Sequence, residues 1–257
     1  MGDPKNVEPE IYLVGRPDID WSELDRFLVD HGLSWNGIAT SDAESLVEAA
    51  GRVCYLSFGK GRKTNREYLE HLIQMKHGSV LEHAVWSFII AGVSRSFTHE
   101  LVRHRAGWSY SQLSQRYVDE SDANLVEPDI IAENEFAHLM WMQATETAKQ
   151  VYADLVKELS HGVTDGKLTT EQRKLVRQAA RSVLPNAAET MVFCTANARA
   201  IRHFIELRGS AGADAEIRRV ALTLLRLMQE EAPAIFRDYE IVEENGIEVV
   251  HTPNVKV

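Results

Sequence analysis

Residues 85–105 read VWSFIIAGVSRSFTHELVRHR, and the spacing of the apolar residues changes within this stretch. Trp86, Phe88 and Ile90 alternate with their neighbours, which predicts a strand that is largely buried on both faces. The apolar residues that then recur every fourth position are Val93, Phe97 and Leu101. That spacing predicts a helix leading directly into Arg103, so a strand and a helix follow each other without a long connection.

The rest of the chain repeats both patterns. Short apolar runs at 11–14 and 190–196 predict two further strands, and Asn245-Gly246 predicts a hairpin turn near the end. Residues followed three positions later by Glu or Gln predict helix starts at Asp20, Ser41 and Thr169, and Thr64 is expected to cap a further helix. A long helix is expected from Phe136 to Leu159, and further helices after Asn197 and Asp214. We expect an α+β fold: one domain over residues 1–257, mostly helical, with a modest antiparallel or mixed sheet.

Composition limits the class of protein. The chain has 257 residues, with 38 acidic and 28 basic side chains and a formal net charge of -10. A general nucleic-acid binder needs cationic surface spread over the fold, so we expect no nucleic-acid partner. No apolar run approaches the ~20 residues of a membrane span, and the charged opening MGDPKNVEPE lacks the features of a secretory leader. We expect a cytoplasmic protein that does not bind membranes.

Arg103 to Tyr117 reverse this acidic balance. The stretch RHRAGWSYSQLSQRY contains four Arg or His residues and five hydroxyl-bearing ones, and no acid. Guanidinium groups present forks of donors that match phosphates and carboxylates, and Ser and Gln add donors that orient a ligand. Gly107 is expected to end the helix and leave Ser109 to Arg116 on a loop. The stretch predicts a local pocket for an anionic ligand.

Several other functional sequence motifs are absent or incomplete. No GxGxxG motif follows a strand, and no histidine belongs to an HExxH motif or stands next to a cysteine in a ligand pair. A metal site is therefore not expected. The segment FGKGRKT, residues 58–64, lacks the GxxxxGK[ST] spacing of a phosphate loop, which favours a solvated basic turn.

Three polar clusters remain, each at the end of a predicted element. The first is His77, Ser79 and Glu82, and the second runs from Glu100 to Arg116. The third consists of Arg181, Asn197, Arg199, His203 and Arg208. Arginine stays protonated at any working pH, so such a site holds anions and stabilises developing charge rather than acting as a base.

Salt bridges are the competing explanation for these arginines. They are the better interpretation for Arg177, Arg202, Arg218 and Arg219. They are the weaker one for Arg103-His104-Arg105, because three adjacent cations without nearby acids repel one another unless an anion is present.

The motifs together resemble the flavin-dependent thymidylate synthase (ThyX) family, whose signature is RHR, a spacer and Ser-x-Arg. The matching segments, in the family's order, are SVLEH at 79–83, THELVRHR at 98–105, YSQLSQRY at 110–117, ARSVLP at 180–185, NAR at 197–199 and HFIELR at 203–208. The resemblance covers roughly residues 41–230, leaving an N-terminal extension and the C-terminal hairpin. Eight residues separate Arg105 from Ser114, where the family usually has seven, and we place the extra residue at 106–108.

The resemblance implies a ThyX-like fold and a homotetramer with sites at subunit interfaces. It implies reductive methylation of dUMP to dTMP with FAD as cofactor, 5,10-methylenetetrahydrofolate as one-carbon donor and NADPH as reductant. The residues that correspond to flavin contacts are Ser79, Arg103, His104, Arg105, Gln112, Asn197, Arg199 and His203. Those that correspond to nucleotide contacts are Glu100, Arg103, Gln112, Leu113, Ser114, Gln115, Arg116, Arg181 and Arg208.

The catalytic residues implied by the resemblance are Arg208 and Ser114. Arg208 corresponds to the arginine beside uracil N3, where it stabilises the enolate, and Ser114 orients the nucleotide. No thiol nucleophile is expected, because Cys54 and Cys194 both stand in apolar runs and are interpreted as small buried side chains.

Two alternatives use the same residues without catalysis. One is a nucleotide- or RNA-binding module, favoured by the dense Arg, Tyr and Trp near 103–117 and opposed by the acidic balance of the chain. The other is a structural oligomer in which the arginines pair across interfaces.

Overall fold

The computed structural model describes residues 7–37, 39–161 and 168–257. The chain divides into two compact units, which are described separately. Unit 1 comprises the described parts of 1–10, 90–101 and 111–192, and unit 2 those of 11–89, 102–110 and 193–257. The turn expected at 162–166 lies outside the described residues.

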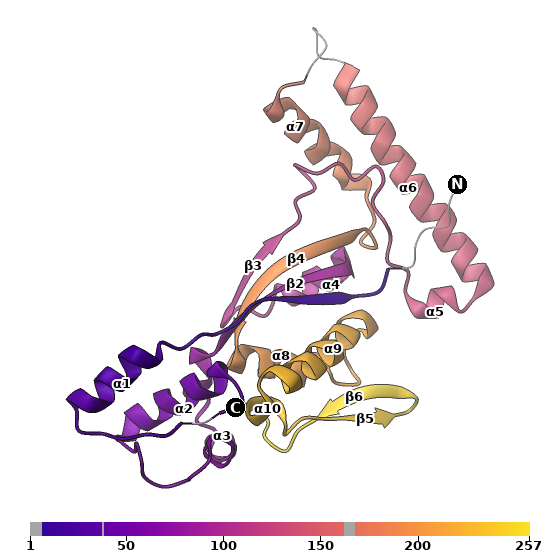
Figure 1. Ribbon diagram of the computed structural model, residues 1–257. Helices are drawn as coiled ribbons and strands as arrows, with labels where there is room; N and C mark the ends of the chain where they lie inside the picture. The colour runs from indigo at the N-terminus through magenta and orange to yellow at the C-terminus, as the bar shows by residue number, and fades with distance from the viewer. Residues whose placement is uncertain (1–6, 38, 162–167) are drawn as a thin grey trace. The chain divides into compact units, whose positions relative to one another are not determined.

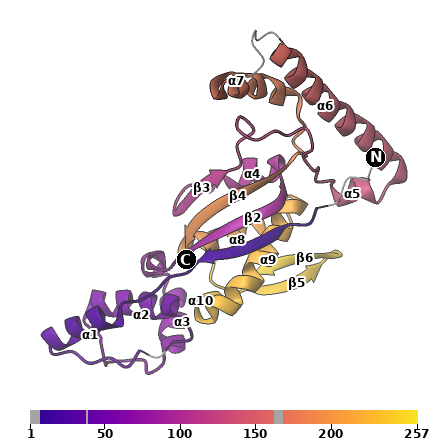
Figure 2. The ribbon, with the colours of Figure 1, turned by 45° about the horizontal axis from the view of Figure 1, so that its top comes forward.

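Four strands form one sheet in the order β1-β2-β4-β3 (Figures 1 and 2). They are β1 (Glu10–Gly15), β2 (Val85–Ser94), β3 (Trp108–Gln112) and β4 (Glu189–Asn197). The strands expected at 11–14, 86–90 and 190–196 are confirmed. Each of the four strands has residues in both units, and the expectation of a single domain over 1–257 stays a prediction.

β3 corrects the loop expected after Gly107. Trp108 and Tyr110 are half-buried while Ser109 and Ser111 are exposed, which is the alternation of a strand with one covered face. The rings of Trp108 and Tyr110 stack with centroids 5.8 Å apart. In the prediction from sequence, the cationic residues on either side of this segment outweighed its alternating pattern.

Three helices of unit 2 precede β2, and side-chain caps fix where they begin. They are α1 (Trp21–Asp30), α2 (Asp42–Tyr55) and α3 (Asn65–Gln74). Thr64 caps α3 as expected, and together with Glu67 it forms a complete capping box. Asp20 and Ser41 accept hydrogen bonds from the main chain of the first turn, so these two predicted helix starts are confirmed as well. The 3₁₀ helix η1 (Gly78–His83) then leads into β2.

The remaining helices of unit 2 follow β4 and supply much of its core. They are α8 (Ala198–Arg208), α9 (Ala215–Glu231) and α10 (Pro233–Phe236), followed by the hairpin of β5 (Glu240–Glu244) and β6 (Ile247–His251). α8 and α9 lie side by side (Figure 1). The predicted turn is confirmed, since Asn245 and Gly246 both have positive φ. Arg202 is buried and pairs in bidentate fashion with Asp238 at 2.7 and 2.8 Å, so its interpretation as a salt-bridge residue is confirmed.

Unit 1 contains the other helices. They are α4 (Arg95–Leu101), α5 (Asp129–Ala132), α6 (Glu135–His161), α7 (Thr170–Ala180) and the 3₁₀ turn η2 (Arg181–Val183). α6 confirms the long helix, and Thr169 with Gln172 forms the predicted capping box of α7. α6 and α7 lie side by side in Figures 1 and 2.

One expectation for unit 1 is wrong: the helix predicted to lead into Arg103 ends at Leu101. Between β3 and α5, Glu120 and Leu125 are buried, and Leu125 forms an isolated bridge to Ala188. Among the helices that the structure describes, none is both long enough and apolar enough to cross a membrane.

Candidate active site

The corner between α4 and β3 is built on Gly107. Its φ is 73°, a left-handed conformation that suits glycine, and its carbonyl accepts a hydrogen bond from the main-chain N–H of Asn197 at 3.2 Å. A Cβ at this position would stand 2.7 Å from Asn197 Nδ2 and 2.8 Å from the Cβ of Ala200. The residues at 106–108, where we place the extra residue, therefore pack tightly against the start of α8.

His104 is the buried member of the Arg-His-Arg triplet. It is 9% exposed, and its Nε2 accepts a hydrogen bond from Nε of Arg208 at 3.0 Å. The hydroxyl of Tyr110 donates to the main-chain oxygen of His104 at 2.7 Å. The ring of Phe204 meets the imidazole edge-on, with centroids 5.1 Å apart. The backbone and the ring of His104 are thus both held in place.

Burial, followed by the charges of Arg208 and His203, lowers the pKa of His104 to about 4. The imidazole is therefore neutral at pH 7, and since its Nε2 is an acceptor, its proton is assigned to Nδ1. This corrects the expectation of three adjacent cations: only Arg103 and Arg105 carry charge, and both are exposed on either side of the buried ring.

A second group of polar residues surrounds the start of α8. Asn197 caps this helix, because its Oδ1 accepts from the main-chain N–H of Ala200 at 2.9 Å. Nη1 of Arg199 lies 2.7 Å from Oε1 of Glu82, and both side chains are about half exposed. The main-chain N–H of Ala198 donates to Ala84 at 2.9 Å, which joins η1 to α8.

The first predicted cluster and most of the third belong to unit 2, where Arg199 pairs with Glu82 and Arg208 contacts His104. The members are Ser79, Glu82, Arg103, His104, Arg105, Asn197, Arg199, His203 and Arg208, which we call the flavin-side cluster. His77, from the first predicted cluster, stacks on Tyr55 with ring centroids 6.3 Å apart. Exposed cations and hydroxyl or amide groups are the donor set that a dinucleotide diphosphate requires, so these residues fit a flavin nucleotide.

The other predicted residues lie in unit 1: Glu100, Gln112, Leu113, Ser114, Gln115, Arg116 and Arg181, which we call the nucleotide-side cluster. Gln112 donates through Nε2 to Oγ1 of Thr98 at 2.9 Å. The N–H of Leu113 donates to the main chain of Met191 at 3.0 Å, so this segment continues along β4. Arg181, a member of the third predicted cluster, follows α7 and belongs to unit 1.

Ser114 begins a tight turn rather than facing a base. Its main-chain oxygen accepts from Tyr117 and Val118, and its Oγ accepts from the N–H of Arg116 at 3.4 Å. The exposed Arg116 lies close enough to help lower the pKa of Glu171, after the larger effect of the Lys174 hydrogen bond. This geometry agrees with an orienting role for Ser114.

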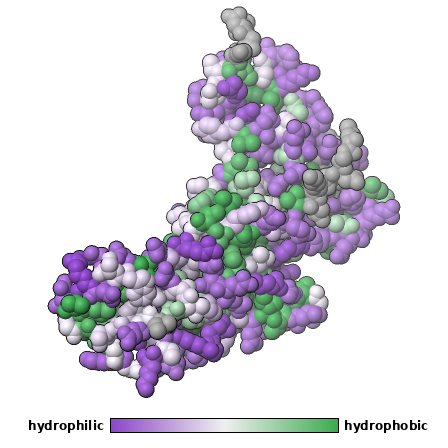
Figure 3. Space-filling view, viewed as in Figure 1, coloured by the Kyte–Doolittle hydropathy of each residue, from purple (hydrophilic) through white to green (hydrophobic). Residues whose placement is uncertain are grey.

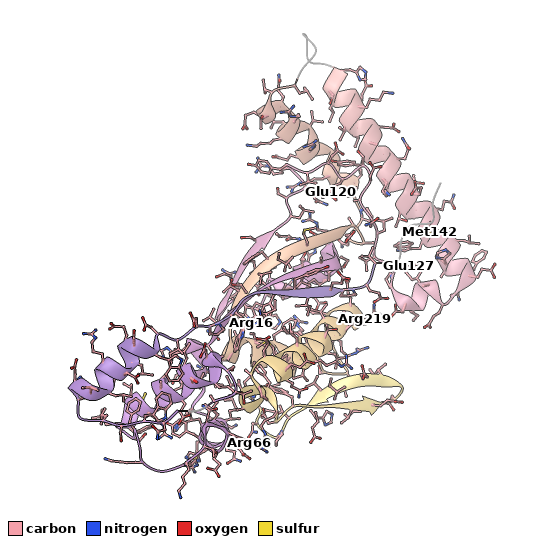
Figure 4. All side chains as sticks on the ribbon, in the orientation of Figure 1. Arg16, Arg66, Glu120, Glu127, Met142 and Arg219 are labelled. Carbon is pink, nitrogen blue, oxygen red and sulfur yellow. The ribbon has the colours of Figure 1, made fainter. Side chains whose placement is uncertain are left out.

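Arg95 was missed at the sequence level. Its Nη2 donates to the main-chain oxygen of Leu113 at 2.8 Å and lies 3.8 Å from Oε1 of Glu120, which Figure 4 labels. Burial lowers the pKa of Arg95, and so does the positive charge of Arg181. Its Nε is a buried donor without a partner. Two neighbouring guanidiniums and an unused donor favour an anion here. An arginine at the first position of α4 was the available signal.

The predictions for the other arginines and for the two cysteines are partly confirmed and partly wrong. Arg177 pairs with Asp119 at 3.3 Å, which confirms its salt-bridge interpretation. Arg218 donates to the main-chain oxygen of Ala213. Cys194 is buried as expected, and burial raises its pKa to about 12, whereas Cys54 is exposed and its buried interpretation is wrong. Among the described residues no group of His, Cys, Asp and Glu is arranged to hold a metal.

The fold is α+β, its arginine clusters are suited to anionic ligands, and the buried thiol of Cys194 has a raised pKa. The comparison with known proteins makes this specific. Residues 38–234 match the family model described as thymidylate synthase complementing protein. A flavin-dependent thymidylate synthase of Mycobacteroides abscessus is 44% identical over 249 residues, covering 94% of this chain and 92% of the relative.

Two further relatives carry the same name. One, from Mycobacterium leprae, is 45% identical over 238 residues, covering 88% of this chain and 92% of the relative. The other, from Mycobacterium tuberculosis, is 45% identical over 234 residues with the same coverage. The chain belongs to the family of flavin-dependent thymidylate synthases, which confirms the resemblance inferred from its motifs.

Proposed function

We propose that the protein is a flavin-dependent thymidylate synthase that methylates dUMP to dTMP, with FAD as cofactor, 5,10-methylenetetrahydrofolate as one-carbon donor and NADPH as reductant. The observation that carries the proposal is the hydrogen bond from Arg208 to the neutral imidazole of His104. It holds a guanidinium in a fixed direction without neutralising its charge, which is what an electrostatic catalyst requires.

The flavin is held by the flavin-side cluster in this proposal. Arg103, Arg105 and Arg199 supply exposed charge for the diphosphate, and Ser79 and His203 add further donors. Glu82 fixes the direction of Arg199 through their ion pair. Bound FAD supplies the hydride and carries the one-carbon unit. The single Nε2 acceptor of His104 is occupied by Arg208, so we assign His104 the role of positioning that side chain.

The nucleotide is held by the nucleotide-side cluster. Arg116 and Arg181 are assigned to the phosphate, and the buried guanidinium of Arg95 adds charge beside Arg181. The main chain of residues 112–115, which is anchored to β4 by the bond from Leu113 to Met191, orients the uracil and ribose together with Ser114 and Glu100. Arg208 stabilises the negative charge that develops on the uracil ring when C5 becomes nucleophilic.

The absence of a protein nucleophile in this route agrees with the states of Cys194 and Ser114. The thiol of Cys194 is fully buried, and its raised pKa leaves almost no thiolate at pH 7. Ser114 has its Oγ in a turn hydrogen bond. Neither residue is arranged for attack on a pyrimidine ring.

We also propose a cytoplasmic homotetramer of single-domain subunits with no nucleic-acid or membrane partner. Apolar side chains remain exposed on the strands: Tyr12 at 50%, Val14 at 50%, Val85 at 41% and Phe193 at 42%. Figure 3 shows green, apolar atoms over the strands of the sheet. Exposed apolar area of this kind supports contacts between subunits.

An absorption spectrum and two variants test the proposal. The purified protein should show the yellow absorption of a bound flavin, which NADPH bleaches in the presence of dUMP. Arg208→Gln should lower kcat by 10²-fold or more, on the order expected for loss of one electrostatic donor, while flavin binding persists. The matched control is Arg226→Gln, because Arg226 is an exposed arginine of the same unit that pairs with Glu248. A colourless protein that fails to support growth of a thymidine auxotroph would refute the function.

A further inference from the structure

A buried arginine holds the basic turn at 57–63 in one shape. Arg52 is 3% exposed, and its Nε lies 2.6 Å from Oε1 of Glu48, which is 2% exposed. Its Nη1 donates to the carbonyls of Ser57 and Lys60 at 2.7 and 3.0 Å, and Nη2 donates to that of Arg62 at 3.1 Å. The segment interpreted from sequence as a solvated basic turn is therefore ordered by an internal charge, which the Glu48 carboxylate balances.

Three carbonyls of the turn, those of Ser57, Lys60 and Arg62, accept hydrogen bonds from the buried Arg52. Gly59 and Gly61 have φ values of 69° and 77°. Within the described chain, the N–H groups of Gly61, Arg62 and Lys63 have no hydrogen-bond acceptor. Successive N–H groups beside left-handed residues form a concave surface that binds anions. In the described chain the turn combines two left-handed glycines with three successive N–H groups that make no hydrogen bond, which favours anion binding.

The side chains of the turn reinforce it. Lys60, Arg62 and Lys63 are exposed, and in the part of the chain that the structure describes no carboxylate forms an ion pair with any of them. Arg62 is near enough to His71 to contribute to the lowering of its pKa, after the larger effect of burial. In a chain with a net charge of -10, this turn is a concentrated positive region.

A cavity of about 330 Å³ opens beside the turn, and Trp35 forms its aromatic wall. Nε1 of Trp35 donates to Oε1 of Glu48 at 3.2 Å, so the indole is fixed by the same carboxylate that balances Arg52. The ring of Phe58 meets the indole edge-on, with centroids 5.8 Å apart. A flat apolar surface next to unpaired cations suits a ligand with an aromatic group followed by anionic groups.

The turn is within reach of the flavin-side cluster. Tyr55 at the end of α2 stacks on His77, which directly precedes η1 and its Ser79. Lys60 follows Tyr55 by five residues, so their Cα atoms are at most about 18 Å apart. Figure 4 labels Arg66, which lies just beyond the turn on α3.

We propose that the turn at 57–63 binds the anionic end of a co-substrate whose reactive end lies at the flavin-side cluster. The chemistry recognised is a group of carboxylates or a phosphate, held by main-chain N–H groups and by Lys60, Arg62 and Lys63. Two co-substrates of the proposed function carry such an end: the glutamyl chain of the folate and the 2′-phosphate of NADPH. The inference therefore rests on the proposed function, and it adds where the far end of one of these ligands is bound.

Binding measurements on the full chain, with FAD and dUMP bound, test whether the turn binds the glutamyl chain of the folate. The probes are pteroylmonoglutamate and pteroyltriglutamate, titrated calorimetrically at low salt. Three exposed charge contacts predict that the triglutamate binds about tenfold more tightly than the monoglutamate. The triple variant Lys60→Gln, Arg62→Gln, Lys63→Gln should abolish this preference, and 0.5 M NaCl should reduce it by screening. The matched control, Lys149→Gln, Lys157→Gln, Arg173→Gln, should retain it.

Steady-state kinetics with NADPH and NADH test whether the turn binds the 2′-phosphate of NADPH. If the triple variant raises the KM for NADPH about tenfold and leaves the KM for NADH unchanged, the turn binds the 2′-phosphate. The variant Gly61→Ala tests the main chain, because it keeps every charge and meets no atom within 4 Å but disfavours the left-handed conformation. Gly61→Ala should weaken whichever preference the triple variant abolishes, that for triglutamate over monoglutamate or that for NADPH over NADH. If that preference is unchanged, the role of the N–H groups is overturned.

The outcomes separate the two proposals. If the triple variant matches the control in both the folate titrations and the NADPH kinetics, the turn proposal is overturned while the thymidylate synthase proposal stands. If the wild-type protein binds neither folate and shows no oxidation of NADPH, both proposals are overturned together.

Discussion

Replacing His104 by Gln should remove a pH dependence from folding stability. Gln keeps an acceptor for Arg208 but does not titrate near neutrality. The native pKa of His104 is about 4, whereas an unfolded histidine titrates near its ordinary value of 6.5. Between these values the unfolded chain binds the proton and the native protein does not. The contribution of the neutral imidazole is therefore complete above pH 6.5 and is lost as the pH falls toward 4.

The size of the effect follows from the same two pKa values. Lowering the pH from 7 to 4.5 should cost the wild-type protein about 2 kcal/mol of unfolding free energy relative to His104→Gln. Urea denaturation of both proteins, at one protein concentration and at several pH values in this range, measures the difference. Other titrating groups cancel because both proteins contain them. Stability curves that run parallel from pH 7 to 4.5 would show that His104 is not held neutral by burial, and would refute the reasoning.

Three further changes have expected outcomes. Gly107→Ala should lower the unfolding free energy by about 2–4 kcal/mol, because it combines a positive φ with a Cβ clash. The control Gly212→Ala should change the melting temperature little, since its Cβ would meet nothing within 4 Å. Arg202→Met should cost about 3–5 kcal/mol in urea denaturation, since it buries no charge itself but leaves the partly buried carboxylate of Asp238 without a counter-charge. Iodoacetamide at pH 8 should alkylate Cys54 in the native protein and leave Cys194 unmodified, by mass spectrometry of tryptic peptides; equal labelling would contradict the burial of the second thiol.

Local rules were sufficient for most of the fold. Helix starts at Thr64 and Thr169 were predictable because a capping box is a contact between residues three apart, visible in the sequence. The hairpin at Asn245-Gly246 was predictable for a similar reason, since few residue pairs accept two positive φ values. β3 was not predicted, because a strand of five residues has a weak pattern and needs its neighbour β4 to form.

The members of the candidate site were named from sequence, but their physical states were not. Adjacent letters suggested three equivalent cations, whereas folding buries His104 and leaves Arg103 and Arg105 exposed. Protonation depends on burial and on Arg208, which lies more than a hundred residues away, and no local pattern reports it. Arg95 was not predicted as a site residue for the same reason. Among the described residues its Nε has no hydrogen-bond partner, and it is buried only when Leu113 and Glu120 pack around it.

Asn197 shows how two demands on one side chain restrict what can replace it. Its Oδ1 caps α8, a role open to Ser, Thr or Asp, while its Nδ2 lies against Gly107 on the side that we assign to the flavin. Loss of function in Asn197→Ala would therefore mix an unravelled helix end with a lost ligand contact. Asn197→Asp keeps the cap and removes the donor, so only a comparison of the two variants separates a folding phenotype from a binding phenotype at this position.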